Sequence, residues 1–125
     1  MVNILIIGIG GFLGAISRYF VSSWSQNLPK LATFPVGTLV VNITGCLAIG
    51  IIFGLVESRN VFNPETRLFL LIGFLGSFTT FSTFGFETFS FFQDGQIGAA
   101  LLNIALNLII GLLATWFGYG ITNSL

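Results

Sequence analysis

Residues 36–56 read VGTLVVNITGCLAIGIIFGLV and contain no charged side chain. About 20 such residues in a helix are enough to cross the hydrocarbon core of a bilayer. Long apolar stretches also occupy residues 4–22, 67–92 and 97–121. Backbone groups in lipid have to form their hydrogen bonds internally, which segments of this length achieve as helices. The sequence therefore predicts an all-α polytopic membrane protein, with one domain over residues 1–125 that holds four transmembrane helices.

The composition excludes several other classes of protein. Hydrophobic residues make up 54% of the chain and charged residues only 6%, whereas soluble domains carry roughly 25% charged residues. Four basic and four acidic side chains balance and there is no histidine, so we expect no surface for nucleic acid. The lone Cys46 excludes an intrachain disulfide and a cysteine metal cluster, and we expect it to be a buried, inert thiol. No basic region precedes the first apolar stretch, so a signal peptide is not expected.

The loops and their charges bear on orientation in the membrane. Loops are predicted at residues 23–35 and 57–66, and the short turn 93–96 should make the third and fourth helices antiparallel neighbours. Four crossings place both termini on one side. An excess of Lys and Arg on one side normally sets the orientation, but here the two sides receive equal numbers. An antiparallel homodimer of two opposite orientations is then possible, and a single orientation set by a weak bias remains the alternative. The basic residues are Arg59 and Arg67 on one side, with Arg18 and Lys30 on the other.

Two pairs of glycines have the spacing of close helix contacts. Gly10 and Gly14 lie four residues apart, as do Gly50 and Gly54. Small residues at this spacing let helices approach closely in lipid. We therefore expect tight packing along the first and second helices.

The third apolar stretch has an unusual composition. Nine of the 15 phenylalanines lie within residues 69–92, and residues 73–87 read GFLGSFTTFSTFGFE. Glycine and hydroxyl side chains weaken a helix, which predicts a break near Gly76 to Thr80. Carbonyl groups exposed at such a break often bind a cation in transporters. The alternative is an unbroken helix whose hydroxyls donate to carbonyls one turn back.

Phe81 and Phe84 are candidates to line an ion pathway. They lie three residues apart and so share one helix face. The edge of an aromatic ring is positive, so ring edges around a narrow path attract a small anion weakly. Simple packing is the alternative role for both rings.

Polar residues on the second and fourth helices could complete such a path. Thr38 and Asn42 share one face of the second helix, and Asn amides offer N–H donors that can replace the water around an anion. A similar stripe steps every four residues along the fourth helix. Hydrogen bonding between helices is the alternative use of these groups. The stripe consists of Asn103, Asn107, Gly111 and Thr115.

Two charged residues fall within the predicted helices. Ionisable groups in a membrane are costly and mark functional positions by default. Glu87 is either a capped structural carboxylate or a pathway residue. Arg18, near the end of the first helix, could extend to the membrane surface, attract anions into a vestibule, or pair across subunits.

The chain resembles the Fluc (CrcB-type) fluoride channels over essentially its whole length. The motifs that carry the resemblance are Gly37-Thr38-Leu39-Val40-Val41-Asn42, Gly73-Phe74-Leu75-Gly76 with Thr79-Thr80-Phe81-Ser82-Thr83-Phe84, the following Glu87, and Gly10, Gly14 and Arg18 of the first helix. The resemblance implies an antiparallel, dual-topology homodimer with two pores in the cell membrane, for this family a prokaryotic inner membrane.

The resemblance also implies roles for individual residues. Asn42, Phe81 and Phe84 match the family's pore residues, and Thr38, Glu87 and Arg18 match positions near the pathway or its entrances. We assign Asn107 and Thr115 of the fourth-helix stripe to the fluoride pathway as well. The sequence departs from the family at Ser77, which replaces a glycine. It also departs at Asn103, Asn107 and Gly111, which replace an aromatic residue or histidine followed by serines.

A structural sodium ion is the cofactor that the resemblance implies. Main-chain carbonyls of Gly76 and Thr79 from both subunits would hold it at the helix break. An unusual backbone conformation is expected at Gly76, so that Gly76→Val should be severe.

The function implied is a passive channel that exports fluoride and lowers its cytoplasmic concentration. No nucleophile, metal cluster or cofactor loop indicates an enzyme. The alternative is a small dual-topology proton-coupled multidrug antiporter, which needs a carboxylate deep in a helix. Residues 4–22 contain no acid, which argues against it. A non-transporting assembly protein is a third class, but it would not need amides and hydroxyls facing aromatic rings.

Overall fold

The computed structural model describes residues 1–27, 33–59 and 61–123, and these residues are helical apart from short turns and connections. Four of its helices are long and apolar enough to cross a membrane. The first is α1 (Val2–Asn27) and the second is α2 (Val36–Arg59). The third runs through α3 (Pro64–Arg67), η1 (Leu68–Leu75), α4 (Gly76–Phe78) and α5 (Phe81–Gln93). The fourth runs through α6 (Ile97–Ala105), η2 (Leu106–Ile110) and α7 (Gly111–Asn123).

Most helices are longer than the apolar stretches that predicted them. The first was predicted to end at residue 22 but continues to Asn27, where the Asn27 side chain donates to the Ser23 carbonyl at 2.9 Å. The second continues to Arg59, and the third begins at Pro64. Apolar length measures only the hydrocarbon crossing, and a helix can extend beyond it wherever water or side chains bond its backbone. Lys30 lies outside the described residues.

The start of the third helix has a simple local cause. Asn63 has an extended backbone, and its side-chain oxygen accepts a hydrogen bond from Thr66 N–H at 2.8 Å. Pro64 follows at the first helical position, where its missing N–H costs no hydrogen bond. The sequence Asn-Pro therefore places the helix boundary.

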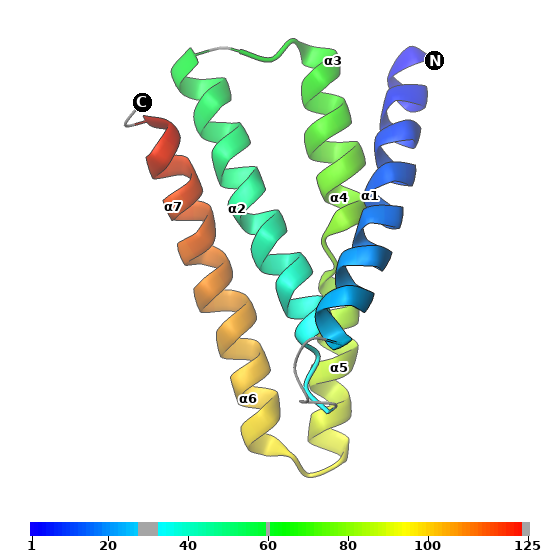
Figure 1. The fold of residues 1–125 in the computed structure, drawn as a ribbon, viewed down its shortest axis with the longest axis vertical. Helices are drawn as coiled ribbons and strands as arrows, with labels where there is room; N and C mark the ends of the chain where they lie inside the picture. The colour runs from blue at the N-terminus through cyan, green and yellow to red at the C-terminus, as the bar shows by residue number, and fades with distance from the viewer. Residues whose placement is uncertain (28–32, 60, 124–125) are drawn as a thin grey trace.

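The helices pack as two pairs that diverge from each other (Figure 1). α1 lies against η1 and α4, while α7 lies against α2. A tight turn with Gly95 at φ 71° joins α5 to α6, which pack as antiparallel neighbours. The predicted contact of the third and fourth helices is therefore confirmed near this turn. Further from the turn, the fourth helix packs against α2 instead of the third helix. The start of α1 and the end of α7 lie at the same end of the bundle.

The predicted close glycine contacts are confirmed. A Cβ atom on Gly10 would lie 2.6 Å from the Phe69 carbonyl oxygen, and one on Gly14 would overlap the Phe74 carbonyl. On the second helix, Gly50 faces a backbone carbonyl of α7 in the same way, and Gly54 faces a threonine hydroxyl of that helix. Glycine is thus required along both seams because the helix backbones touch.

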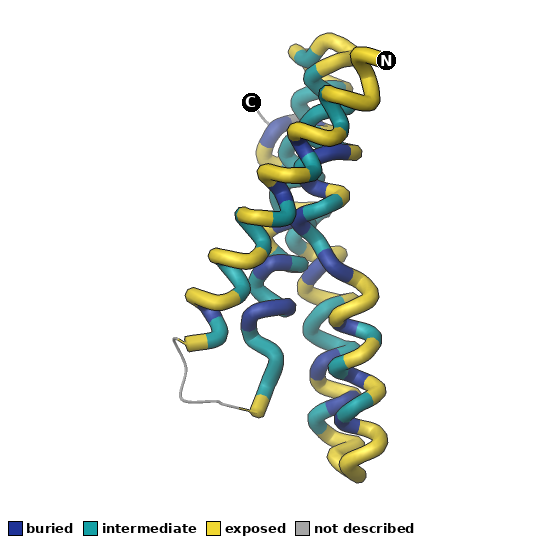
Figure 2. The backbone as a smooth tube through the Cα atoms, turned by 90° about the vertical axis from the view of Figure 1, so that its right-hand side faces the viewer, coloured by how far each residue is buried: buried dark blue, intermediate teal, exposed yellow. Residues whose placement is uncertain are grey.

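Little of the surface is hidden within the single chain (Figure 2). The core is a small cluster centred on Val41, Leu75 and Phe78. Exposed positions are shown in yellow along the outside of every helix, and they include large apolar residues such as Phe12, Phe81 and Trp116. An apolar exterior of this kind suits lipid or a further protein chain as the surroundings.

Candidate functional site

The backbone leaves the helical conformation between α4 and α5. Thr79 has φ −77° and ψ 155°, and Thr80 has φ −145° and ψ 102°, which are extended values. The Thr80 side chain then caps α5, because its oxygen accepts a hydrogen bond from Thr83 N–H at 3.3 Å. Thr79 instead donates its hydroxyl to the Leu75 carbonyl at 3.0 Å. Two successive threonines thus end one helical segment and begin the next.

Asn42 of α2 bonds both backbone groups of Thr80. Thr80 N–H donates to Asn42 Oδ1 at 2.9 Å, and Asn42 Nδ2 donates to the Thr80 carbonyl at 3.2 Å. In a continuous helix, Thr80 N–H would donate to the carbonyl of Gly76. The Gly76 carbonyl has therefore lost its usual helical donor. Gly76 itself has φ −60° and ψ −32°, which are ordinary helical values. The prediction of an unusual backbone conformation at this glycine is therefore wrong.

A pocket of about 370 Å³ lies beside this interruption, and we call it the central pocket. It brings together residues from the second, third and fourth helices that the sequence had singled out. Cys46 also lines it and is half-buried rather than fully buried as expected. The sequence-predicted residues in its wall are Asn42, Gly76, Thr79, Phe81, Phe84, Asn107 and Thr115.

The two candidate rings lie together in this wall but differ in exposure. The ring centroids of Phe81 and Phe84 are 5.4 Å apart, with the planes inclined at 59°. Phe81 is 78% exposed in the single chain, whereas Phe84 is only 7% exposed. One ring therefore faces inward and the other faces whatever surrounds the chain.

The amide groups of the central pocket are bonded to each other. Asn42 Nδ2 donates to Asn107 Oδ1 at 3.0 Å, in addition to its bond to Thr80. Asn107 Nδ2 donates to the backbone carbonyl and to the side-chain oxygen of Asn103, both at 3.0 Å. Because an amide nitrogen carries two protons, an anion reaches one only by displacing a protein acceptor. The single O–H of Thr115 is likewise engaged, because the carbonyls of Cys46 and Gly111 both lie 3.1 Å from its oxygen and share it as acceptors.

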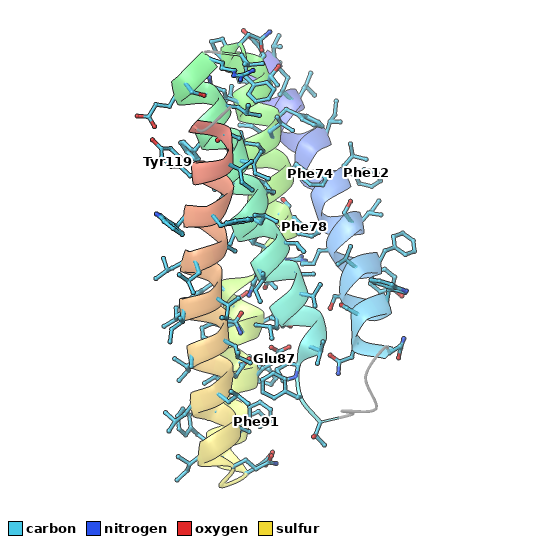
Figure 3. The ribbon with its side chains drawn as sticks, turned by 60° about the vertical axis from the view of Figure 1, so that its left-hand side comes forward. Phe12, Phe74, Phe78, Glu87, Phe91 and Tyr119 are labelled. Atoms are coloured by element: carbon cyan, nitrogen blue, oxygen red, sulfur yellow. The ribbon has the colours of Figure 1, made fainter. Side chains whose placement is uncertain are left out.

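Three other predicted residues lie outside the central pocket. The Thr38 hydroxyl donates to Glu87 Oε1 at 2.6 Å, linking α2 to α5. Glu87 is labelled in the lower half of the bundle in Figure 3. Glu87 Oε2 is buried and has no hydrogen-bond partner among the described residues. Arg18 and Thr38 line a separate hollow of about 280 Å³, which also contacts Thr80. Glu87 lines a further hollow of about 410 Å³ together with Asp94.

Comparison with known proteins identifies the family. The family model described as "CrcB-like protein, Camphor Resistance (CrcB)" matches residues 5–119. The chain belongs to the CrcB-like family. Among its relatives, "Fluoride-specific ion channel FluC 1" of Methanosarcina acetivorans is 43% identical over 94% of this chain and 88% of the relative. "Fluoride-specific ion channel FluC" of Hydrogenovibrio crunogenus is 45% identical over 94% of this chain and 89% of its own. The protein of the same name from Flavobacterium psychrophilum is 42% identical over the full length of both chains.

Neither Thr88 nor a place for Asn103 in the site was predicted from the sequence of this CrcB-like chain. Asn103 is fully buried and bonds Asn107, and Thr88 is 7% exposed and bonds Asn103. Helical spacing could have predicted Thr88, because residues 81, 84 and 88 share one face of α5. Threonine at the last of these positions turns a hydroxyl toward the stripe of the fourth helix.

Proposed function

We propose that this CrcB-like protein is a passive, fluoride-selective channel. The observation that carries the proposal is the central pocket, which joins the amides of Asn42 and Asn107 to the rings of Phe81 and Phe84 beside a helix interruption. Among the described residues, no carboxylate or basic side chain belongs to its wall. The relatives named as fluoride-specific ion channels match this chain over nearly its whole length.

Fluoride passes the pocket by exchanging one set of weak contacts for another. Asn42 gives up a neutral bond to Asn107 Oδ1 and donates the same N–H to the anion instead. Hydrogen bonds to an ionised acceptor are roughly twice as strong as neutral ones, so the exchange is favourable without trapping the ion. The positive edges of Phe81 and Phe84 continue the path where no donor is available. Movement down the gradient needs no coupled proton, because the part of the pocket wall that the structure describes holds no acid.

The channel is a homodimer of two antiparallel chains. Phe81 is 78% exposed although it lines the central pocket, and a second copy would cover it. Gly76 is exposed as well: apart from the nearest turns of its own helix, the Leu71 carbonyl, at 3.7 Å, is the one described group within 4 Å of the position of a Cβ atom. The balanced Lys and Arg residues allow both orientations in the membrane, in which two pores form about a common axis.

Sodium is the structural cation of this dimer. The Gly76 carbonyl lacks its helical donor, Thr79 is extended, and both residues lie in the wall of the central pocket. Carbonyl oxygens are hard ligands suited to such a cation. Gly76 and Thr79 of two chains would hold the ion, which supplies a fixed positive charge beside the path. The cation would then bind carbonyl oxygens for which lipid provides no hydrogen-bond donor.

The protein works in the cell membrane, the inner membrane of a prokaryotic cell, where it lets fluoride leave the cytoplasm. The test is efflux from liposomes that contain purified protein and are loaded with potassium fluoride or potassium chloride. Fluoride should leave rapidly with a potassium ionophore present, chloride should stay, and a proton gradient should change neither. Equal loss of both anions, or fluoride movement only with a proton gradient, would refute the proposal and favour another transport class.

A further inference from the structure

A directed chain of hydrogen bonds starts at the helix interruption. Thr80 N–H donates to Asn42 Oδ1 at 2.9 Å, and Asn42 Nδ2 donates to Asn107 Oδ1 at 3.0 Å. Asn107 Nδ2 then donates to Asn103 Oδ1 at 3.0 Å. Each side-chain oxygen in this series accepts a hydrogen bond from the group before it. All three side-chain amides therefore point in the same direction along this series of hydrogen bonds.

This series of hydrogen bonds ends at a buried position on α5. Asn103 Nδ2 donates to Thr88 Oγ1 at 2.9 Å, and the Thr88 hydroxyl donates to the Phe84 carbonyl at 2.8 Å. Asn103 is fully buried and Thr88 is 7% exposed, so water has little access to this end. Thr88 does not belong to the wall of the central pocket. Its side chain is linked to the pocket amides through Asn103 and Asn107, and to the backbone of Phe84 in the pocket wall.

Both ends of the chain impose the observed direction. A backbone N–H at Thr80 can only donate, which turns Asn42 Oδ1 toward it. The Phe84 carbonyl can only accept, so the Thr88 hydroxyl uses its single O–H to donate a hydrogen bond to it. The Thr88 oxygen is then left to accept from Asn103, and Asn103 must turn its own oxygen toward Asn107. Without the hydroxyl, the buried N–H of Asn103 has no acceptor and the amides lose this constraint.

The direction of the amides matters for an anion. An N–H group attracts fluoride, whereas a bare amide oxygen repels it. In the observed direction the oxygens of Asn42 and Asn107 are each covered by a donor. Only N–H groups then remain to be exchanged with a passing ion.

We propose that Thr88 is a positioning residue, which together with Asn103 fixes the direction of the Asn107 and Asn42 amides in the central pocket. The proposal rests on the function given above, because it concerns how N–H groups are offered to fluoride. It adds a residue outside the pocket wall to the machinery that selects the anion.

The test compares three hydroxyl variants in liposomes. Thr88→Val keeps the shape but removes the acceptor, and Thr88→Ser keeps the hydroxyl. Thr122→Val is the matched control, since Thr122 is 4% exposed and donates to the Tyr119 carbonyl at 2.9 Å within its own helix. We expect Thr88→Val to lower fluoride efflux per folded dimer about tenfold and to reduce the ratio of fluoride to chloride. Thr88→Ser and Thr122→Val should stay within about twofold of the unmodified protein.

A double variant separates positioning from general loss of stability. If Thr88 acts through Asn107, then Thr88→Val should add little to the loss caused by Asn107→Ala. Losses that multiply as independent effects would overturn the proposal, as would full fluoride efflux and selectivity in folded Thr88→Val protein. Should Thr88→Val fail to fold, Thr88→Cys provides the same comparison, because a thiol is a weak acceptor. Unchanged efflux in Thr88→Cys protein would then refute the proposal.

Side-chain amide NMR spectra in detergent micelles give a second readout that does not depend on ion flux. Thr88→Val should shift the NH₂ resonances of Asn103, Asn107 and Asn42, while Thr122→Val should leave all three in place. If the unmodified protein carries no fluoride, the proposed function fails and these resonances alone decide whether Thr88 sets the amide direction. Unshifted resonances of Asn107 and Asn42 in Thr88→Val protein would refute that direction setting.

Discussion

At the scale of single residues, the rings of Phe81 and Phe84 offer a direct test of the pathway. Replacing either ring with isoleucine keeps apolar bulk but removes the positive ring edge. We expect each variant to fold as the unmodified protein does and to lose at least about tenfold in fluoride efflux, which corresponds to about 1.4 kcal/mol in the barrier. Efflux from liposomes, normalised to folded protein, is the measurement.

Phe12→Ile supplies the control for this experiment. Phe12 is 66% exposed, comparable to Phe81, but it lies on α1 and outside the central pocket. Its replacement should leave efflux unchanged. If the folded double variant Phe81→Ile/Phe84→Ile keeps full efflux, both rings serve only packing.

The bond between Thr38 and Glu87 predicts a stability effect. Glu87 Oε1 has the Thr38 hydroxyl as its donor at 2.6 Å, and Oε2 has no partner among the described residues. Thr38→Val would leave both carboxyl oxygens without a donor among the described residues, which should cost about 1–3 kcal/mol. Thr38→Ser keeps the hydroxyl and should unfold close to the unmodified protein. Thermal unfolding in detergent measures the difference, and equal midpoints for the Val and Ser variants would contradict this account.

The sequence predicted which residues meet but not how they bond. Asn42 and Phe81 were singled out by type and helical spacing, and both line the central pocket. The pairing of Asn42 with the Thr80 backbone could not be predicted, because it depends on the distance between two helices. The same holds for Thr88, whose partner Asn103 is 15 positions further along the chain. Spacing within one helix shows which residues share a face, while contacts between helices require the packing itself.

At the scale of helices, the glycine seams predict a contrast between neighbouring positions. A Cβ atom at Gly14 would overlap the Phe74 carbonyl, which cannot move without shifting the third helix. At Gly8, no atom of the described residues lies within 4 Å of the same position, apart from the backbone of the helix itself. We expect Gly14→Ala to be strongly destabilising and Gly8→Ala to be neutral or slightly stabilising, since alanine is the better helix former.

Thermal unfolding and the yield of folded protein in detergent are the measurements for this pair. Alanine tolerated equally at residues 14 and 8 would show that α1 does not approach the third helix as closely as the structure has it. The control is strict because both glycines lie on α1 and the added atoms are the same.

The helices were predictable because lipid leaves the backbone few choices. Apolar length alone located four crossings, and the glycine pairs located two close seams. The ends were predicted less well, since α1 continues through polar residues to Asn27. The π-helical segments η1 and η2 gave no warning in the sequence. Such widened turns are frequent at functional sites, and both lie beside the central pocket, to which they contribute Leu75 and Asn107.

At the scale of the whole molecule, orientation in the membrane should respond to a few added charges. With the basic residues balanced, reporters fused to the C-terminus should give signal on both sides of the membrane. Three lysines added after Leu125 should force one orientation and abolish fluoride efflux from cells. An oppositely biased copy expressed together with it should restore the activity. A reporter found on one side only in the unmodified protein would exclude the antiparallel dimer.

Sodium should act on the assembled dimer rather than on the anion. Because main-chain oxygens of Gly76 and Thr79 would hold it, Thr79→Ser should be mild. Replacing sodium with a large organic cation should lower the dimer's unfolding midpoint and weaken efflux, with no change in the preference for fluoride over chloride. If neither fluoride efflux nor the unfolding midpoint depends on sodium, the proposal of a central cation is contradicted.

Gly76→Ala is a further check on the dimer. The helical backbone and the open space at Gly76 accept a Cβ atom within one chain. A loss of stability or efflux in this variant would therefore indicate that a second copy lies close to Gly76.

The half-buried thiol of Cys46 in the wall of the central pocket gives the natural protein a chemical handle. It is the only cysteine in the sequence, so a thiol reagent has one place to attach and no cysteine-free background has to be engineered. Small reagents of different charge and size, added from one side of a vesicle or the other, would report how wide the route to the pocket is from each direction. A modified Cys46 would also place an obstruction or a spectroscopic label beside Gly111, where a Cβ atom would lie 3.3 Å from the sulfur.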